Sequence, residues 1–186
     1  GAFLRSRGVA VDAVLPAPEA AHPGGLAALR AAGGRIVSQL SPETDLVIDA
    51  VVGLGGRGPL RPAAAAAFAA VAGIPVIAVD LPSGIDPDTG VVHAPSVRAD
   101  ISVTFGERRN AHLLAAPQCG RVEVIDLGLE PGEPALAALT DAEIAARWPL
   151  PGPDDDKYSQ GVVGIVAGSD TYPGAAVLST SAAVAA

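Results

Sequence analysis

Strand-length apolar runs alternate with helical patterns along most of this chain, and this alternation limits the fold more than any other feature. Residues 45–52 form a nearly continuous apolar run, and further strand patterns, that at 35–37 a short one, lie at residues 9–15, 35–37, 74–80, 99–105 and 121–127. Helical patterns over residues 24–32 and from Pro62 onward separate some of them. Strands that alternate with helices form βαβ units with parallel pairing and right-handed crossovers. The sequence therefore predicts an α/β fold with a parallel sheet.

Composition and charge exclude several other classes of protein. Hydrophobic residues make up 49% and charged residues 17% of the 186 residues, so the chain has enough apolar side chains for an ordered core. The formal net charge of −8 argues against nucleic-acid binding. The one cysteine, Cys119, cannot form an intrachain disulfide, so we expect a buried thiol and a reducing, cytoplasmic location.

Residues 62–79 carry no charge, and the run is long enough for a membrane-spanning helix. Gly73 and Pro75 interrupt it, however, and its first half is mostly alanine, which is only weakly hydrophobic. We therefore expect a helix, a turn and a buried strand in this region, and no membrane association.

The chain changes character after residue 130. Residues 131–153 are rich in proline and contain a capping-box pattern from Thr140 to Glu143, which predicts a linker with one short helix. Residues 161–167 are typical of a new strand, and an alanine-rich helix is expected from residue 174. Because residues 1–7 also resemble the end of a helix, we expect a fragment whose two ends both lie inside elements.

Ligands of parallel sheets bind at the carboxyl ends of the strands, and two loops occupy such positions. The first, residues 53–59, contains a G-x-G-x-x-G pattern, and Asp80 ends the next strand, as in a dinucleotide-binding fingerprint. The following helix begins only near Pro62, however, rather than within the glycine motif. An NAD-dependent oxidoreductase that uses Gly53–Gly58 and a turn-rich loop without a ligand are both open alternatives.

The second loop, residues 80–90, is rich in carboxylates. Asp86 and Asp88 are typical of side chains that form turns with their own backbone. Asp80 is different, because it is the first residue after an apolar strand and lies where ligands bind. Asp49 lies inside a strand, where a carboxylate is costly unless it is paired or bound to a metal.

Four segments follow one another in a specific order: Ile48–Gly55 (IDAVVGLG), Val79–Asp86 (VDLPSGID), Ala99–Gly106 (ADISVTFG) and Gly120–Leu129 (GRVEVIDLGL). Together they resemble the NAD(P)H-hydrate epimerase family. The resemblance implies a Rossmann-like, three-layer αβα domain that interconverts the R and S epimers of hydrated NADH or NADPH.

The resemblance also implies roles for residues in both loops. Asp80 would contact the hydrated ring as the acid/base catalyst, and Asp49 and Ser83 would hold a potassium ion. The loop implied to bind the diphosphate through backbone amides consists of Gly53, Leu54, Gly55, Gly56, Arg57, Gly58 and Pro59. Leu54 replaces the threonine of the family pattern. The family's Asn-Asn-Gly-Gly-Asp loop has no counterpart here, and we expect it upstream of Gly1.

Residues 156–175 begin DKYSQG and end GSDTYPGA. This segment resembles the opening of the ADP-dependent NAD(P)H-hydrate dehydratase family, which has a ribokinase-like fold, although Asp156 replaces the family's histidine. The resemblance implies that Ala175 contacts substrate and that dehydration of the S epimer uses ADP or ATP with Mg²⁺. It also implies that most of the dehydratase domain lies outside this chain.

The expected organisation is therefore the C-terminal part of an epimerase domain at 1–130, a linker with a short helix at 131–153, and the first strand and helix of a dehydratase domain at 154–186. This is the order of the bifunctional nicotinamide-nucleotide repair enzymes. The expected partner is a small-molecule nicotinamide nucleotide, in a homo-oligomer without nucleic acid or membrane. A non-catalytic, epimerase-like binding protein is the other alternative. His22, His93 and His112 are expected in loops and match no metal-ligand spacing.

Overall fold

The computed structural model describes residues 1–130, 132–148, 150–159 and 161–185. The chain divides into two units, Gly1–Ala137 and Ala138–Ala186, and each is described by itself.

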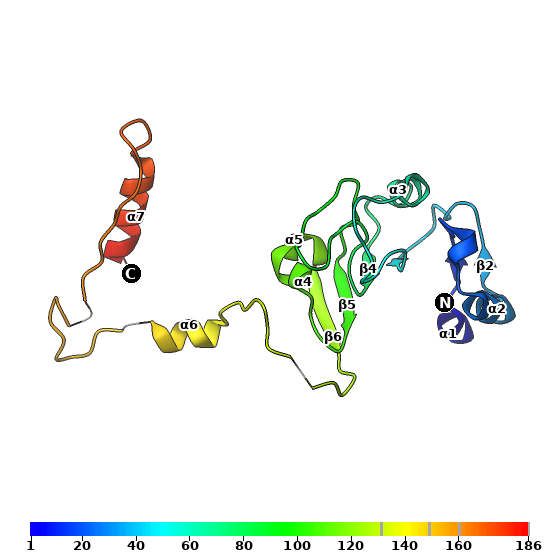
Figure 1. Ribbon diagram of the computed structural model, residues 1–186, viewed down its shortest axis with the longest axis horizontal. Coiled ribbons are helices and arrows are strands. Elements are labelled where there is room, and N and C mark those ends of the chain that lie inside the picture. The colour runs from blue at the N-terminus through cyan, green and yellow to red at the C-terminus, as the bar shows by residue number, and fades with distance from the viewer. Residues whose placement is uncertain (131, 149, 160, 186) are drawn as a thin grey trace. The chain divides into compact units, whose positions relative to one another are not determined.

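A four-stranded parallel sheet forms the centre of the first unit, in the order β3-β4-β5-β6. Its strands are β3 (Val47–Asp49), β4 (Val76–Val79), β5 (Ile101–Phe105) and β6 (Arg121–Ile125). Figure 1 shows β4, β5 and β6 side by side. The predicted α/β fold with a parallel sheet is confirmed. Each strand is shorter than the apolar run that predicted it, because the residues at one or both ends of each run are not paired with a neighbouring strand.

A second, two-stranded parallel sheet pairs β1 (Asp12–Ala13) with β2 (Arg35–Ile36). The Arg35 guanidinium donates two hydrogen bonds of 2.7 Å to the Asp12 carboxylate across this pair. The helix α1 (Ala2–Ser6) precedes it, and a short 3-10 helix, η1 (Pro18–Ala20), and α2 (Pro23–Ala31) connect its strands.

The run at residues 62–79 folds as predicted, into a helix, a turn and a strand. The helix α3 (Pro62–Ala69) begins with proline, whose missing N–H is not needed in the first turn. No helix in the described part of the chain is both long and apolar enough to cross a membrane. Between β5 and β6 lie two short helices, α4 (Asn110–Leu114) and α5 (Ala116–Cys119).

Two apolar clusters pack on the same face of the four-stranded sheet. One contains β-strand residues such as Ala78 together with Ala64 of α3, and the other contains Ala111 and Cys119 of α4 and α5. The register aligns Asp49, Ala78, Ser102 and Val122 on this face. On the opposite face Ile48, Phe105 and Ile125 are 47%, 48% and 46% exposed. The third layer of the expected three-layer arrangement therefore stays a prediction.

The second unit contains two helices among its described residues. The capping box predicted from Thr140 to Glu143 begins α6 (Asp141–Arg147), and α7 (Gly174–Ala185) matches the expected alanine-rich helix. The strand predicted over 161–167 is wrong, because the described residues of this segment form no strand. A strand needs a neighbour for its backbone hydrogen bonds, and no described residue pairs with this segment, whose Val162 and Val166 are exposed. The ribokinase-like fold stays a prediction.

Candidate active site

A pocket of about 250 Å³ opens at the carboxyl ends of β3, β4 and β5. Its walls come from the loop after β3, from the end of β4 and from the segment after β5. The lining residues are Ala50, Val52, Gly53, Leu54, Val79, Asp80, Phe105 and Arg109. The position agrees with the general rule that parallel sheets bind ligands at this edge.

Asp80 follows β4 directly and is held in an uncommon backbone conformation. Its φ of 72° is the only positive value at a non-glycine residue in the described part of the chain. Its backbone N–H donates to the Val103 carbonyl at 2.7 Å, and its Oδ1 accepts from the Thr104 hydroxyl at 2.9 Å. Strained residues of this kind cluster at functional sites. Val103 of β5 thus holds the backbone of Asp80, and Thr104 of β5 holds its carboxylate at the pocket.

His112 was expected in a loop, and this expectation is wrong: it lies in α4 and is only 4% exposed. Its Nδ1 accepts from the Arg109 backbone N–H at 2.8 Å, so the ring proton is on Nε2. This Nε2 lies 2.8 Å from the Asp80 carbonyl oxygen and donates to it. His112 therefore holds the strained backbone of Asp80 in place. An isolated histidine in the sequence carries no signal for this contact.

Asp49 and Ser83, predicted to act together, are direct neighbours. The Ser83 hydroxyl and backbone N–H both donate to the Asp49 carboxylate at 2.7 Å, and each residue is 1% exposed. The Val51 N–H donates to Asp49, and the Val52 N–H to the Ser83 hydroxyl. Burial raises the pKa of Asp49 above its ordinary value, and the bonds from Ser83 partly oppose that rise. The partner that a buried carboxylate requires is supplied here by Ser83.

The donor chemistry of this pair fits a hard cation only as part of a ligand set. Asp49 Oδ2 accepts one hydrogen bond, from Ser83, and so keeps a free lone pair. Hard cations in proteins are bound by several oxygen ligands. The described residues contain no cluster of three or more acidic, histidine or cysteine side chains that could hold a metal. Further ligands would have to be carbonyl, hydroxyl or water oxygens.

The glycine-rich loop after β3 keeps most of its backbone amides free. Within the described residues, the amide of Gly56 donates to the Gly53 carbonyl, whereas the amides of Gly53, Leu54, Gly55, Arg57 and Gly58 have no hydrogen-bond partner. A Cβ built on Gly53 would lie 3.8 Å from Asp80 Oδ2, so the loop and the carboxylate adjoin. Unpaired amides in a turn form a favourable environment for an anion.

The structure brings some of the predicted residues of the first unit together at one sheet edge, whereas Gly55, Gly56, Arg57, Gly58 and Pro59 do not line the pocket. Gly53, Leu54 and Asp80 line the pocket, and Asp49 and Ser83 lie buried beside it. Arg109 lines the same pocket and was not predicted. Its position after β5, where a third strand ends, was the signal that could have identified it. Ala175 belongs to the second unit, in the first turn of α7, and its role stays a prediction.

These features define a Rossmann-like α/β protein with a pocket at the carboxyl edge of a parallel sheet. Residues 1–111 match the family described as YjeF-related protein N-terminus. The chain belongs to this family.

Several curated proteins are similar over nearly the whole chain. A protein of Mycobacterium leprae named bifunctional NAD(P)H-hydrate repair enzyme Nnr is 58% identical over 99% of this chain. The protein of the same name from Mycobacterium tuberculosis H37Rv is 57% identical over 99%. The chain spans 39% of the length of each of these two relatives. An NAD(P)H-hydrate epimerase of Microbacterium testaceum is 36% identical over 75% of this chain and 61% of its own length.

Proposed function

We propose that this chain forms part of an enzyme that repairs hydrated NADH and NADPH, and that its first unit epimerises them. The observation that carries the proposal is the fixed Asp80 carboxylate at a pocket bordered by free loop amides. The names of the similar repair enzymes and of the similar epimerase give the substrate class.

Inverting the carbinol carbon of a hydrated nicotinamide ring requires a bond to break and re-form on the opposite face. Either step moves a proton to or from the substrate, so a carboxylate within reach of the ring is needed. Asp80 is the catalytic acid/base in this proposal, and Thr104 and His112 are its positioning residues. The loop Gly53–Pro59 binds the diphosphate through its amides, and Arg109 adds positive charge at the same pocket.

Asp49 and Ser83 contribute two oxygen ligands to a potassium ion in this proposal. The bound ion would supply a positive charge that compensates the buried carboxylate. For the second segment we propose the start of an ADP-dependent dehydratase that acts on the S epimer with Mg²⁺, in which Ala175 contacts substrate. A cytoplasmic homo-oligomer is part of the same proposal.

The proposal is tested by Asp80→Asn in the intact protein. Asparagine tolerates the left-handed conformation of this position but cannot take up a proton in the same way. We expect relaxation of the R:S ratio of hydrated NADH, followed by chromatography, to slow by about 100-fold or more. Asp45→Asn is the matched control, because Asp45 is an exposed aspartate before the other end of β3.

Wild-type relaxation in Asp80→Asn would refute the assignment of Asp80 and favour a non-catalytic binding protein. The other alternative, an NAD-dependent oxidoreductase, is not favoured. The helix that follows the glycine loop begins only at Pro62, so its N-terminus does not form part of the glycine motif.

A further inference from the structure

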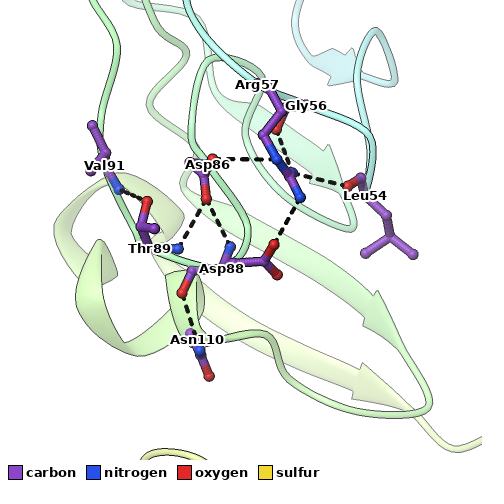
Figure 2. Close-up of polar contacts among 8 residues, drawn as sticks. All are labelled: Leu54, Gly56, Arg57, Asp86, Asp88, Thr89, Val91 and Asn110. Carbon is purple, nitrogen blue, oxygen red and sulfur yellow. Dashed lines mark hydrogen bonds and ion pairs between the residues drawn. The ribbon is translucent and has the colours of Figure 1, made fainter.

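Arg57 of the glycine loop contacts two carbonyl groups of its own loop and the turn after β4 (Figure 2). Its Nη1 donates to the carbonyl oxygen of Gly56 at 2.8 Å and reaches that of Leu54 at 3.4 Å. Its Nη2 pairs with Asp88 at 2.7 Å, and its Nε lies 3.5 Å from Asp86. One side chain therefore contacts two carbonyls of its own loop and two carboxylates of another.

The turn that carries the two carboxylates is itself held by hydrogen bonds. Asp86 accepts from the backbone N–H groups of Asp88 and Thr89, and these bonds close the turn (Figure 2). The Thr89 N–H in particular lowers the pKa of Asp86, and Arg57 adds to the effect, so this carboxylate stays ionised. The Asp88 carbonyl accepts from the Asn110 side chain at the start of α4. Arg57 is thus tied to a hydrogen-bonded turn that also contacts the segment carrying Arg109.

The side chains of this ion pair are largely exposed, so their role is to position the loop rather than to stabilise the fold. The side chains of Arg57 and Asp88 are 55% and 67% exposed. Exposed ion pairs contribute little to folding stability. Their effect on a local loop can nevertheless be large. Among the described residues, the only backbone hydrogen bond donated by residues 53–58 is the one from Gly56 to Gly53.

We propose that Arg57 is a positioning residue that clamps the glycine loop against the turn at residues 86–88. The clamp holds the free loop amides in one arrangement, ready for an anionic group of the ligand. Its guanidinium is occupied by carboxylates and loop carbonyls and acts through the loop rather than on the substrate. The inference rests on the proposed function for the identity of the anion, which is the substrate diphosphate.

The test uses Arg57→Ala, Asp88→Asn and the double variant in the intact protein. The clamp predicts that KM for hydrated NADH rises about tenfold in Arg57→Ala and about threefold in Asp88→Asn, with kcat within about twofold. The double variant should be no worse than Arg57→Ala, because both substitutions remove the same contact. Arg121→Ala is the matched control, since Arg121 forms a similarly exposed pair with Glu123 at the start of β6.

Asp88→Asn distinguishes a clamp from direct phosphate binding. A guanidinium that binds the diphosphate itself would be released by Asp88→Asn, and KM would stay at the wild-type value or fall. That result overturns the inference. A KM unchanged in Arg57→Ala overturns it as well.

Hydrogen exchange in peptides covering residues 53–60 gives a readout that does not require catalysis. The clamp predicts faster exchange in Arg57→Ala and Asp88→Asn but not in Arg121→Ala, and unchanged exchange overturns it. A wild-type protein that neither epimerises hydrated NADH nor binds ADP-ribose would refute the proposed function alone, and the exchange measurement would still decide whether the clamp exists.

Discussion

The free-energy cost of burying Asp49 depends on its hydrogen bonds with one residue, Ser83. Asp49 is buried on the face of the sheet that carries the helices, and burial disfavours its ionised form. Ser83 donates both its backbone N–H and its hydroxyl to this carboxylate. The backbone donor is present with any side chain, whereas the hydroxyl can be removed by a single substitution.

Ser83→Ala should therefore destabilise the protein in a pH-dependent manner. The folded-state pKa of Asp49 is already raised above its ordinary value of 3.8. As pH rises through this raised pKa, Asp49 becomes ionised in the folded protein and the free energy of unfolding falls. Loss of the hydroxyl raises this pKa further. We expect a loss of about 1–3 kcal/mol near neutral pH in urea unfolding, and a smaller loss at about pH 4, where Asp49 is partly protonated.

Ser102→Ala is the matched control for this pH dependence. Ser102 is a buried serine whose hydroxyl donates to the Cys119 carbonyl at 2.7 Å, with no ionisable acceptor. Its substitution should cost about 1 kcal/mol at both pH values. Equal losses at both pH values for Ser83→Ala would contradict the assigned role of the hydroxyl.

At the scale of elements, the entry into β6 depends on Gly120. This residue ends α5 and precedes β6, with φ of 61°, and lies against the beginning of β5. A Cβ at this position would overlap the backbone carbonyl oxygen of Asp100, which accepts the Arg121 N–H at 2.9 Å. The close approach and the positive φ both require glycine.

Gly120→Ala should destabilise the sheet by about 3 kcal/mol or more, because the backbone of Ala99 and Asp100, just before β5, must move. Gly128→Ala is the control, since Gly128 also has a positive φ, of 68°, but a Cβ there would meet open space. It should cost only about 1 kcal/mol. Urea unfolding followed by circular dichroism measures both, and similar losses in the two variants would argue against the close contact.

The elements that could be predicted from the sequence are those defined by local signals. Pro62 begins a helix, and the apolar run before Asp80 becomes β4, because proline and apolar patterning act within a few residues. The contacts of Asp49 with Ser83 and of Asp80 with His112 join residues 34 and 32 positions apart. Only the Asp49–Ser83 pair was expected, from a family resemblance. The prediction of a strand at 161–167 failed because a strand requires a partner strand as well as suitable residues.

For the whole molecule, the division into two units gives a further expectation. Residues 132–140 are exposed and lie outside any helix or strand. Exposed, irregular backbone is the preferred substrate of proteases. The helix α3 is richer in alanine than this segment, but its backbone is hydrogen-bonded and Ala64 is buried.

Brief digestion with a protease of broad specificity should therefore cut first within residues 132–140. Mass spectrometry should detect a fragment close to Gly1–Ala137 before any other large product. The alanine-rich helix α3 serves as an internal control for sequence preference, and initial cleavage within it would contradict the division.

The strained backbone of Asp80 has a consequence for anyone who wishes to make this protein more robust. A positive φ at a residue with a Cβ lowers folding stability by about 1–3 kcal/mol, and glycine would remove that penalty. A search guided by stability alone would thus favour Asp80→Gly, which removes the carboxylate proposed for catalysis. Asp80 is thus a position at which selection for stability and selection for activity would favour different residues.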